Sequence, residues 1–190
     1  MTYYGGKELA NAFRTVRKNT IQIAEDIPEG KYDFKPSAES RTIRQTLTHM
    51  AVATTFPTML HGERIPIEKI DFAEYLQKVS AEEAKPRTKA DIVALLRDSG
   101  EKFAAMLESL GEPFFAEVVT FRPGAEPPAR TRFDMLLAAK EHEMHHRGQL
   151  MVMERMIGVV PHLTRQAQER MARFQAQQAA QPGTGAPASR

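Results

Sequence analysis

The interpretation of this 190-residue chain starts from residues 141–150, EHEMHHRGQL. Three of the six histidines, His142, His145 and His146, fall within five consecutive positions of this stretch. The stretch otherwise has the composition of a helix. His142 and His146 are four residues apart, so on a helix they share one face, one turn above the other. Two imidazoles in that relation can bind one divalent metal ion. The stretch also satisfies H-E-x-x-H, the zinc peptidase pattern, in which Glu143 would be the general base.

Long amphipathic segments precede this stretch and continue through it. Apolar residues at spacings of three and four predict four long helices, and two further pieces are predicted to be helical. Thr42 with Gln45 predicts a capping box at the start of the second long helix. A Thr–Asp pair with the same spacing begins the third helix and the fourth. The predicted ranges are 7–27, 42–61, 88–110 and 131–157 for the long helices, and 71–79 and 164–178 for the other two. Within the second long helix, Pro57 is expected to cause a kink or an early stop.

Residues 115–121 alternate between apolar and polar side chains, which predicts a strand, and Arg122-Pro123-Gly124 predicts a turn after it. The fold class is therefore all-α: a four-helix bundle with a short hairpin between helices three and four and an extra C-terminal helix. Residues 1–162 are predicted to form the bundle domain. Residues 163–190 are predicted to be an extension, helical at first and then flexible by its Gly and Pro content.

Composition limits the functional classes. Twenty-six basic and 24 acidic residues give a net charge of +2, and no basic run interleaves with aromatics, so no nucleic-acid partner is expected. The chain has no cysteine, which fits a reducing compartment and excludes thiolate ligands. Neither a signal-like N-terminus nor an apolar run of about 20 residues is visible, so no membrane association is expected. We therefore predict a cytoplasmic location.

The helical register brings a third histidine to the pair. Steps of four and three along the fourth helix predict a buried line through His142, His146 and Gln149, and the second helix has a similar line through His49. His49 is thus expected to face His142 and His146. Three neutral imidazoles with an open position are typical of a catalytic zinc site, and nickel, iron or manganese is also compatible. The two predicted lines are Met135, Ala139, His142, His146, Gln149, Met153 and Met156, and Thr46, His49, Ala53, Phe56 and Leu60.

The other polar residues near the motif receive weaker assignments. Gln149 is the better candidate for orienting a ligand histidine, and His145 either supports a ligand or is solvated. Arg147 either forms a structural ion pair or binds a substrate anion. His61 is expected at a helix end beside the last carbonyls, and His162 in an exposed turn.

Several segments together resemble the DinB/YfiT-like family. They are Thr48-His49-Met50-Ala51, the run from His142 to Leu150, residues 27–36 between the first two helices, and the close at 155–161. The resemblance covers about residues 7–162. It implies a four-helix bundle, usually dimeric, and a divalent metal ion held by three side chains, which correspond here to His49, His142 and His146. All three ligand positions match as histidines.

The resemblance implies a metal site, but it does not specify the reaction, because members of the family catalyse different ones. Family members include transferases and isomerases that use low-molecular-weight thiols, and others are described as metal-dependent hydrolases or damage-inducible proteins. The leading hypothesis is therefore a metal-dependent enzyme on a small-molecule substrate, with zinc or nickel, a separate thiol cofactor because the chain lacks cysteine, and a homodimeric state. A non-catalytic metal-binding or stress-response protein is the alternative. A peptidase is less favoured, because the glycine and third histidine that extend one peptidase motif are replaced by Gln149 and Val152.

Overall fold

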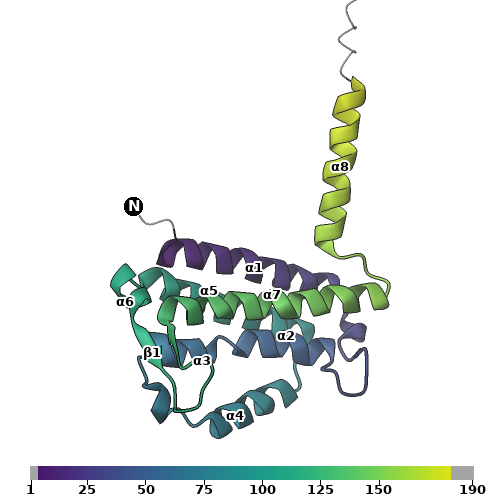
Figure 1. The fold of residues 1–190 in the computed structure, drawn as a ribbon. Coiled ribbons are helices and arrows are strands. Elements are labelled where there is room, and N and C mark those ends of the chain that lie inside the picture. Colours follow the sequence, from purple (N-terminus) through teal and green to yellow (C-terminus); the bar gives the residue numbers. More distant parts are fainter. Residues whose placement is uncertain (1–3, 181–190) are drawn as a thin grey trace, which may run out of the picture.

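The computed structural model describes residues 4–180, and its core is a bundle of four helices (Figure 1). They are α1 (Gly6–Asp26), α2 (Ile43–Val52), α5 (Lys89–Ser109) and α7 (Arg132–Met156). The first packs along α5 and α7, and α2 packs against α5 and α7 from the other side. The predicted four-helix bundle is confirmed.

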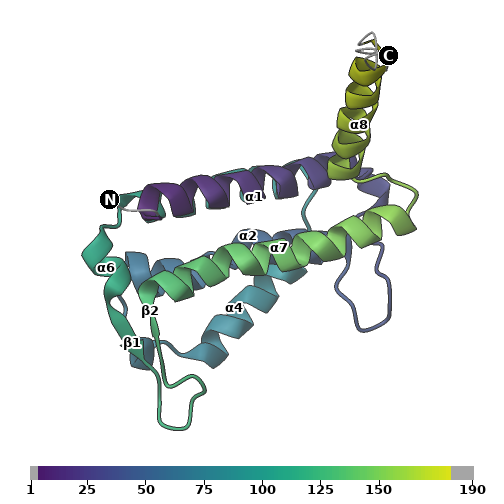
Figure 2. The same ribbon diagram turned by 45° about the horizontal axis from the view of Figure 1, so that its top comes forward.

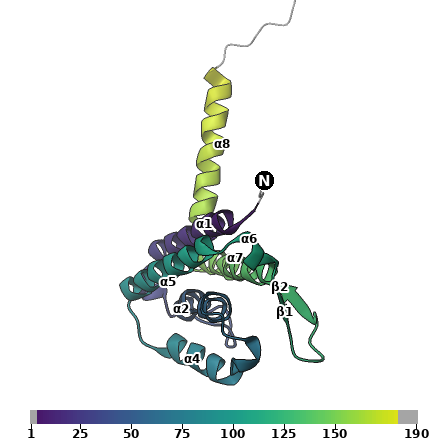
Figure 3. The ribbon, with the colours of Figure 1, turned by 90° about the vertical axis from the view of Figure 1, so that its left-hand side faces the viewer.

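Shorter elements connect these helices. Between α2 and α5 lie α3 (Thr55–Pro57), a π-helical turn (Thr58–Gly62), a 3₁₀ turn (Ile67–Lys69) and α4 (Phe72–Ala84), which covers the outer side of α2 (Figure 3). Between α5 and α7 come α6 (Glu112–Ala116) and an antiparallel hairpin of β1 (Val118–Thr120) and β2 (Ala129–Thr131), visible at one end of the bundle in Figure 2. A further 3₁₀ turn (Glu29–Lys31) follows α1.

The predicted helix starts are confirmed by their capping contacts. Thr42 accepts a hydrogen bond from the amide of Gln45, whose side chain accepts one from the amide of Thr42. Thr88 and Asp91 form the same reciprocal pair at α5. At α7 the Thr131 hydroxyl accepts from the amide of Asp134. These contacts satisfy amide groups that the first helical turn leaves without partners.

The core divides into two clusters along the bundle. The α1 stripe of Phe13, Val16, Thr20, Ile23 and Ile27 is buried as predicted and contributes to both. One cluster joins Ile23 and Ile27 to the buried apolar faces of α2, α5 and the end of α7. The other joins Phe13 to Phe103, with ring centroids 4.8 Å apart, and to the α6 aromatics. The histidine region of α7 lies between them.

Three predicted boundaries are wrong. The second helix ends at Val52 rather than near 61, because Thr55–Pro57 and the π-helical turn re-form the chain in separate short pieces. Residues 115 and 116 belong to α6 instead of the strand, so the hairpin strands are only three residues long. The helix predicted at 71–79 extends to Ala84.

The predicted buried line on α7 is only partly correct: His146 and Met153 are buried, but the buried face as a whole is displaced around the helix. His142, Gln149 and Met156 are exposed, whereas Glu143 and Glu154 are buried. The prediction put the line through the apolar and histidine positions. The bundle instead buries two carboxylates, Glu143 and Glu154. The buried side of α7 consists of Leu136, Glu143, His146, Leu150, Met153 and Glu154.

The last helix, α8 (His162–Ala180), extends away from the bundle (Figures 1 and 3). It was predicted at 164–178, so its existence is confirmed with slightly wider bounds. His162, expected to be exposed, is 4% exposed, because its Nε2 contacts the Asn19 side chain of α1 at 3.2 Å. The predicted flexible ending at 181–190 lies outside the described residues. No helix among residues 4–180 is long and apolar enough to cross a membrane.

Glu154 is fully buried, and neither of its carboxylate oxygens has a hydrogen-bond partner among the described residues. Burial, reinforced by the nearby Asp26 carboxylate, raises the pKa of Glu154 to about 7. The folded protein therefore holds a proton that the unfolded chain releases near pH 4.5, and the free energy of unfolding falls as pH rises from about 4.5 to about 7.

Glu154→Gln should remove this penalty. At pH 8 we expect the variant to be more stable than the wild type by about 2–3 kcal/mol, and at pH 4 the two should be nearly equal. Urea unfolding of the metal-free proteins at both pH values measures the difference, in which the histidine contributions common to both proteins cancel. A difference between the two proteins that does not change with pH would contradict this account.

Candidate metal centre

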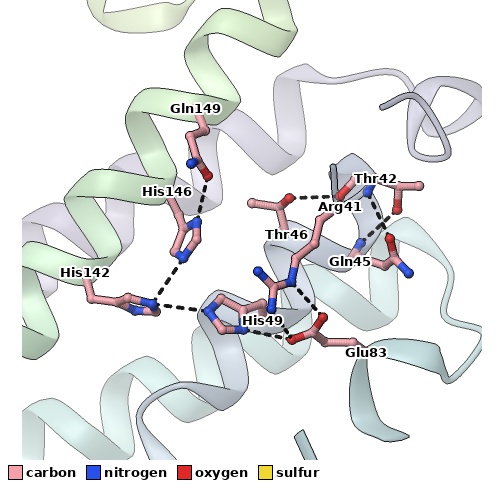
Figure 4. Close-up of polar contacts among 9 residues, drawn as sticks. All are labelled: Arg41, Thr42, Gln45, Thr46, His49, Glu83, His142, His146 and Gln149. Carbon is pink, nitrogen blue, oxygen red and sulfur yellow. Dashed lines mark hydrogen bonds and ion pairs between the residues drawn. The ribbon is translucent and has the colours of Figure 1, made fainter. Parts of the chain in front are cut away.

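Three histidines from two helices come together where α2 faces α7 (Figure 4). α2 supplies His49, and α7 supplies His142 and His146. The Nε2 atom of His142 lies 3.2 Å from Nε2 of His49 and 3.1 Å from Nε2 of His146. One ligand atom from each of the three residues lies within 4.8 Å of the others. The predicted convergence of these residues is therefore present in the structure.

The contacts of the Nδ1 atoms of His49 and His146 determine which ring nitrogens of these residues face the centre. His49 Nδ1 lies 2.8 Å from Oε1 of Glu83, and His146 Nδ1 lies 2.8 Å from Oε1 of Gln149. Both oxygens only accept, so each Nδ1 carries the proton and donates it. The Nε2 atoms of His49 and His146 are then left with lone pairs that face His142. An N–H of His142 can donate to only one of these two lone pairs. A cation can accept a lone pair from the Nε2 atoms of all three histidines.

The two contacts between these nitrogens have the spacing of metal ligands, and all three ligand atoms lie within 4.8 Å of one another. Nitrogens about 2.0–2.1 Å from a tetrahedral zinc ion are about 3.3–3.4 Å apart, close to the observed 3.1 and 3.2 Å. An oxygen acceptor for each Nδ1–H is the arrangement that orients metal-binding histidines elsewhere. The residues present therefore fit a divalent ion, which His49, His142 and His146 would hold.

The protonation states favour the same use. Burial lowers the pKa of all three histidines, and for His142 the two neighbouring imidazoles lower it further, to about 4. Burial has the largest effect in each case, while Glu83 and Gln149 partly oppose it for His49 and His146. The three rings are thus neutral at pH 7, as metal ligation requires.

Glu83 was not predicted as a site residue from the sequence. This residue of α4 is 34 positions from His49 and belongs to no recognisable motif, because only the packing of α4 on α2 brings the two together. Arg41 donates to the other Glu83 oxygen at 2.8 Å, which fixes the carboxylate in place. A carboxylate on the outer nitrogen of a ligand histidine orients the ring and raises its basicity.

Glu83→Gln should lower the affinity for zinc by about 10- to 100-fold, because the histidine loses its charged acceptor. A zinc titration against a competing chelator measures this change. The neighbouring Glu82→Gln is the matched control, since Glu82 pairs with Lys85 and Arg87 and has no contact with a histidine. Equal zinc affinity in Glu83→Gln and Glu82→Gln would show that Glu83 does not support the site.

Gln149 occupies the position that sequence analysis proposed for orienting a ligand. Its amide oxygen accepts from His146, and its amide nitrogen lies 3.1 Å from Nε2 of His145. His145 is therefore linked to the centre through Gln149 and through the edge-to-face packing of its ring on His146, with ring centroids 4.9 Å apart. Arg147, for which an ion pair or an anion site was considered, has a buried Nε with no hydrogen-bond partner among the described residues.

Glu143 has a structural environment that the motif did not reveal. Arg17 of α1 donates to both carboxylate oxygens at 2.8–3.0 Å, and the Thr20 hydroxyl donates at 2.9 Å. The same guanidinium donates to the carbonyls of Met50 on α2 and Leu96 on α5, so it ties all four bundle helices together. A peptidase base would have to leave this buried pair, which weighs against the peptidase alternative.

Other residues near the site have separate roles. His61, expected at a helix end, is buried, and its Nδ1 lies 3.1 Å from the guanidinium of Arg132. Burial, together with this guanidinium, lowers the pKa of His61 to about 4.

Two pockets flank the three histidines of the candidate centre. An apolar pocket of about 390 Å³ reaches His142, and a more polar pocket of about 790 Å³ reaches His146 and is lined by Arg41, Thr46, His145 and Gln149 among others.

The fold and the site together define a class: helical-bundle proteins with a three-histidine centre between the second and last bundle helices. Residues 12–150 match the model of the DinB superfamily, and the chain belongs to this superfamily. The resemblance inferred from the sequence is thereby confirmed.

Individual relatives agree with this assignment. YjoA of Bacillus subtilis, an uncharacterised protein, is 26% identical over 156 residues, which is 80% of this chain and 90% of YjoA. The crystal structure of YjoA, a DinB-like protein, superposes with a TM-score of 0.60 at 24% identity, covering 80% of this chain and 92% of that one. YfiT of B. subtilis, described as a probable metal-dependent hydrolase with an unusual four-helix-bundle topology, gives a TM-score of 0.62 at 15% identity, covering 84% and 91%.

Proposed function

We propose that this protein is a metal-dependent enzyme that acts on small molecules through an ion held by His49, His142 and His146. One observation carries the proposal: the lone pairs of His49 and His146 are directed at His142 while their other nitrogens are held by Glu83 and Gln149. Three protein ligands leave coordination positions for a water or a substrate, which is the arrangement of catalytic rather than structural zinc sites. Zinc and nickel are the proposed ions.

A divalent ion in such a site lowers the pKa of a water or thiol bound to it, so that a nucleophile forms near neutral pH. The chain's own residues prepare the site. Glu83 and Gln149 hold two imidazoles in fixed orientations, and the Arg17–Glu143 pair fixes α7 against the other three helices. The description of YfiT as a probable metal-dependent hydrolase supports a hydrolase.

A transferase that uses a low-molecular-weight thiol is the other form of the same proposal. The chain contains no cysteine, so a thiol would have to come from a separate molecule. The polar pocket beside His146 has room for a hydrophilic one, and Arg41, Thr46, His145 and Gln149 offer it charged and hydrogen-bonding groups. Hydrolysis and thiol transfer need the same ion and differ in the nucleophile.

The test compares zinc-loaded, nickel-loaded and chelator-stripped protein with a panel of esters, epoxides and activated aromatic halides, each with and without a small hydrophilic thiol such as cysteinylglycine. We expect turnover of at least one electrophile that disappears on stripping and returns on reloading. Turnover that is unaffected by removal of the metal would contradict the proposal.

A non-catalytic metal protein remains the alternative, because an ion held by both α2 and α7 would also join these helices. It predicts a large gain in melting temperature on zinc binding and no turnover in the panel. Homodimerisation and a cytoplasmic location stay predictions, and light scattering of the purified protein would test the first of them.

A further inference from the structure

We propose that the apolar pocket beside His142 binds the body of the substrate, and that the substrate is a small, uncharged molecule with an aromatic ring. This inference rests on the proposed function, because it names the substrate class of the same site. It depends on the shape, the lining and the charge of the pocket, which are independent of the reaction type.

The pocket lies between α2, α3, α4 and α7. Its volume of about 390 Å³ is at the lower end of the range for small-molecule sites and is more than twice that of a 150 Å³ cavity known to hold benzene. One or two fused rings with small substituents therefore fit. The residues that carry the argument are Phe56, Phe72, Tyr75, Leu76, Ala139 and His142.

One wall of the pocket is aromatic. The ring of Phe56 lies 5.4 Å from that of Phe72 and 5.5 Å from that of Tyr75, in tilted arrangements. Phe72 and Leu76 of α4 nevertheless remain 47% and 60% exposed. A flat apolar ligand would cover part of this surface, and aromatic pairs contribute stabilisation beyond the area they bury.

The charged groups at the pocket are already paired, so the ligand is uncharged where it contacts them. Glu143 is the carboxylate among the described lining residues, and its oxygens are bound by Arg17 and Thr20. Arg130 is paired with Asp134 at 2.5 Å. His61 is neutral at pH 7 because burial and Arg132 lower its pKa to about 4.

His142 belongs to both the pocket and the three-histidine cluster, so a ring in the pocket lies beside the metal centre. The polar pocket lies on the side of His145 and His146. An apolar electrophile and a hydrophilic nucleophile would thus approach the histidines from different pockets.

α4 has two roles in this arrangement. It supplies Glu83 to His49 and supplies Phe72, Tyr75 and Leu76 to the pocket, although none of its residues is fully buried. The specificity for the ring is therefore assigned to α4.

Two metal-binding probes test the inference by binding alone. Acetohydroxamate and benzohydroxamate have the same metal-binding head and differ in a methyl group or a phenyl ring. We expect benzohydroxamate to bind the zinc-loaded protein about 10- to 100-fold more tightly in calorimetric titrations, as burial of a phenyl ring predicts. Ala139→Trp, which fills the pocket, should remove this preference.

Val152→Trp is the matched control, because Val152 lies on the same helix but lines the polar pocket. It should keep the preference. Leu76→Asp, at an exposed position, should lower the preference even if Ala139→Trp disturbs the helix. Equal binding of the two hydroxamates by the wild type would overturn the inference but not the proposed function. Loss of the preference in Val152→Trp but not in Leu76→Asp would do the same. Failure of both hydroxamates to bind would overturn the proposed function and the inference with it.

Discussion

Replacing His49 with alanine is expected to lower the zinc affinity by more than about 100-fold. Loss of an outer hydrogen-bond partner alone costs about 10- to 100-fold, and His49 supplies one of only three protein ligands. The fold should persist, because His49 is only half-buried and the apolar cores on either side of it are unchanged. A chelator-competition titration measures the affinity, and circular dichroism of the metal-free variant checks the fold.

His145→Ala is the matched histidine control. His145 is exposed, and its ring nitrogen contacts the Gln149 amide rather than the other ring nitrogens, although the ring itself packs against His146. Its loss should therefore change the zinc affinity by less than about 10-fold. If both variants lose affinity equally, the loss in His49→Ala is not specific, and His49, His142 and His146 are not the complete ligand set.

Replacing Arg17 with methionine is expected to lower the free energy of unfolding by about 3–5 kcal/mol, because it leaves the Glu143 carboxylate buried without its partner. The two side chains are only 4% and 3% exposed. The guanidinium also satisfies the carbonyls of Met50 and Leu96, which would lose a donor. Space for the arginine depends on Gly100, whose missing Cβ would lie 2.6 Å from Cγ of Arg17.

Urea unfolding of the metal-free proteins measures this effect. The double variant Arg17→Met with Glu143→Leu should recover a large part of the lost stability, because no charge then remains buried. If Arg17→Met costs less than about 1 kcal/mol, the pair does not hold the helices as described. A double variant no more stable than Arg17→Met would show that the carbonyl contacts matter more than the charge.

The bundle and its site could be predicted because local signals were strong. The Thr42 and Thr88 capping pairs and the α1 stripe fix helix starts and faces through contacts within one turn. His142 and His146 share a face on any helix, and His49 is the histidine on the predicted buried line of the second helix. These inferences needed only the helical period.

The errors came from interactions between distant segments. The burial of Glu143 depends on Arg17, 126 positions away, and no local pattern shows that a carboxylate will be in the core. Glu83 reaches His49 only because α4 folds back over α2. The burial of His162 likewise depends on Asn19 of α1. Such contacts follow from tertiary packing, which a single sequence does not reveal.

An X-ray absorption spectrum of the zinc-loaded protein tests the central claim most directly. The arrangement of Nε2 atoms predicts three imidazole nitrogens at about 2.0–2.1 Å from the ion in the wild type and two in His49→Ala. A wild-type spectrum with fewer than three imidazoles, or one that is unchanged in His49→Ala, would contradict a metal centre built from His49, His142 and His146.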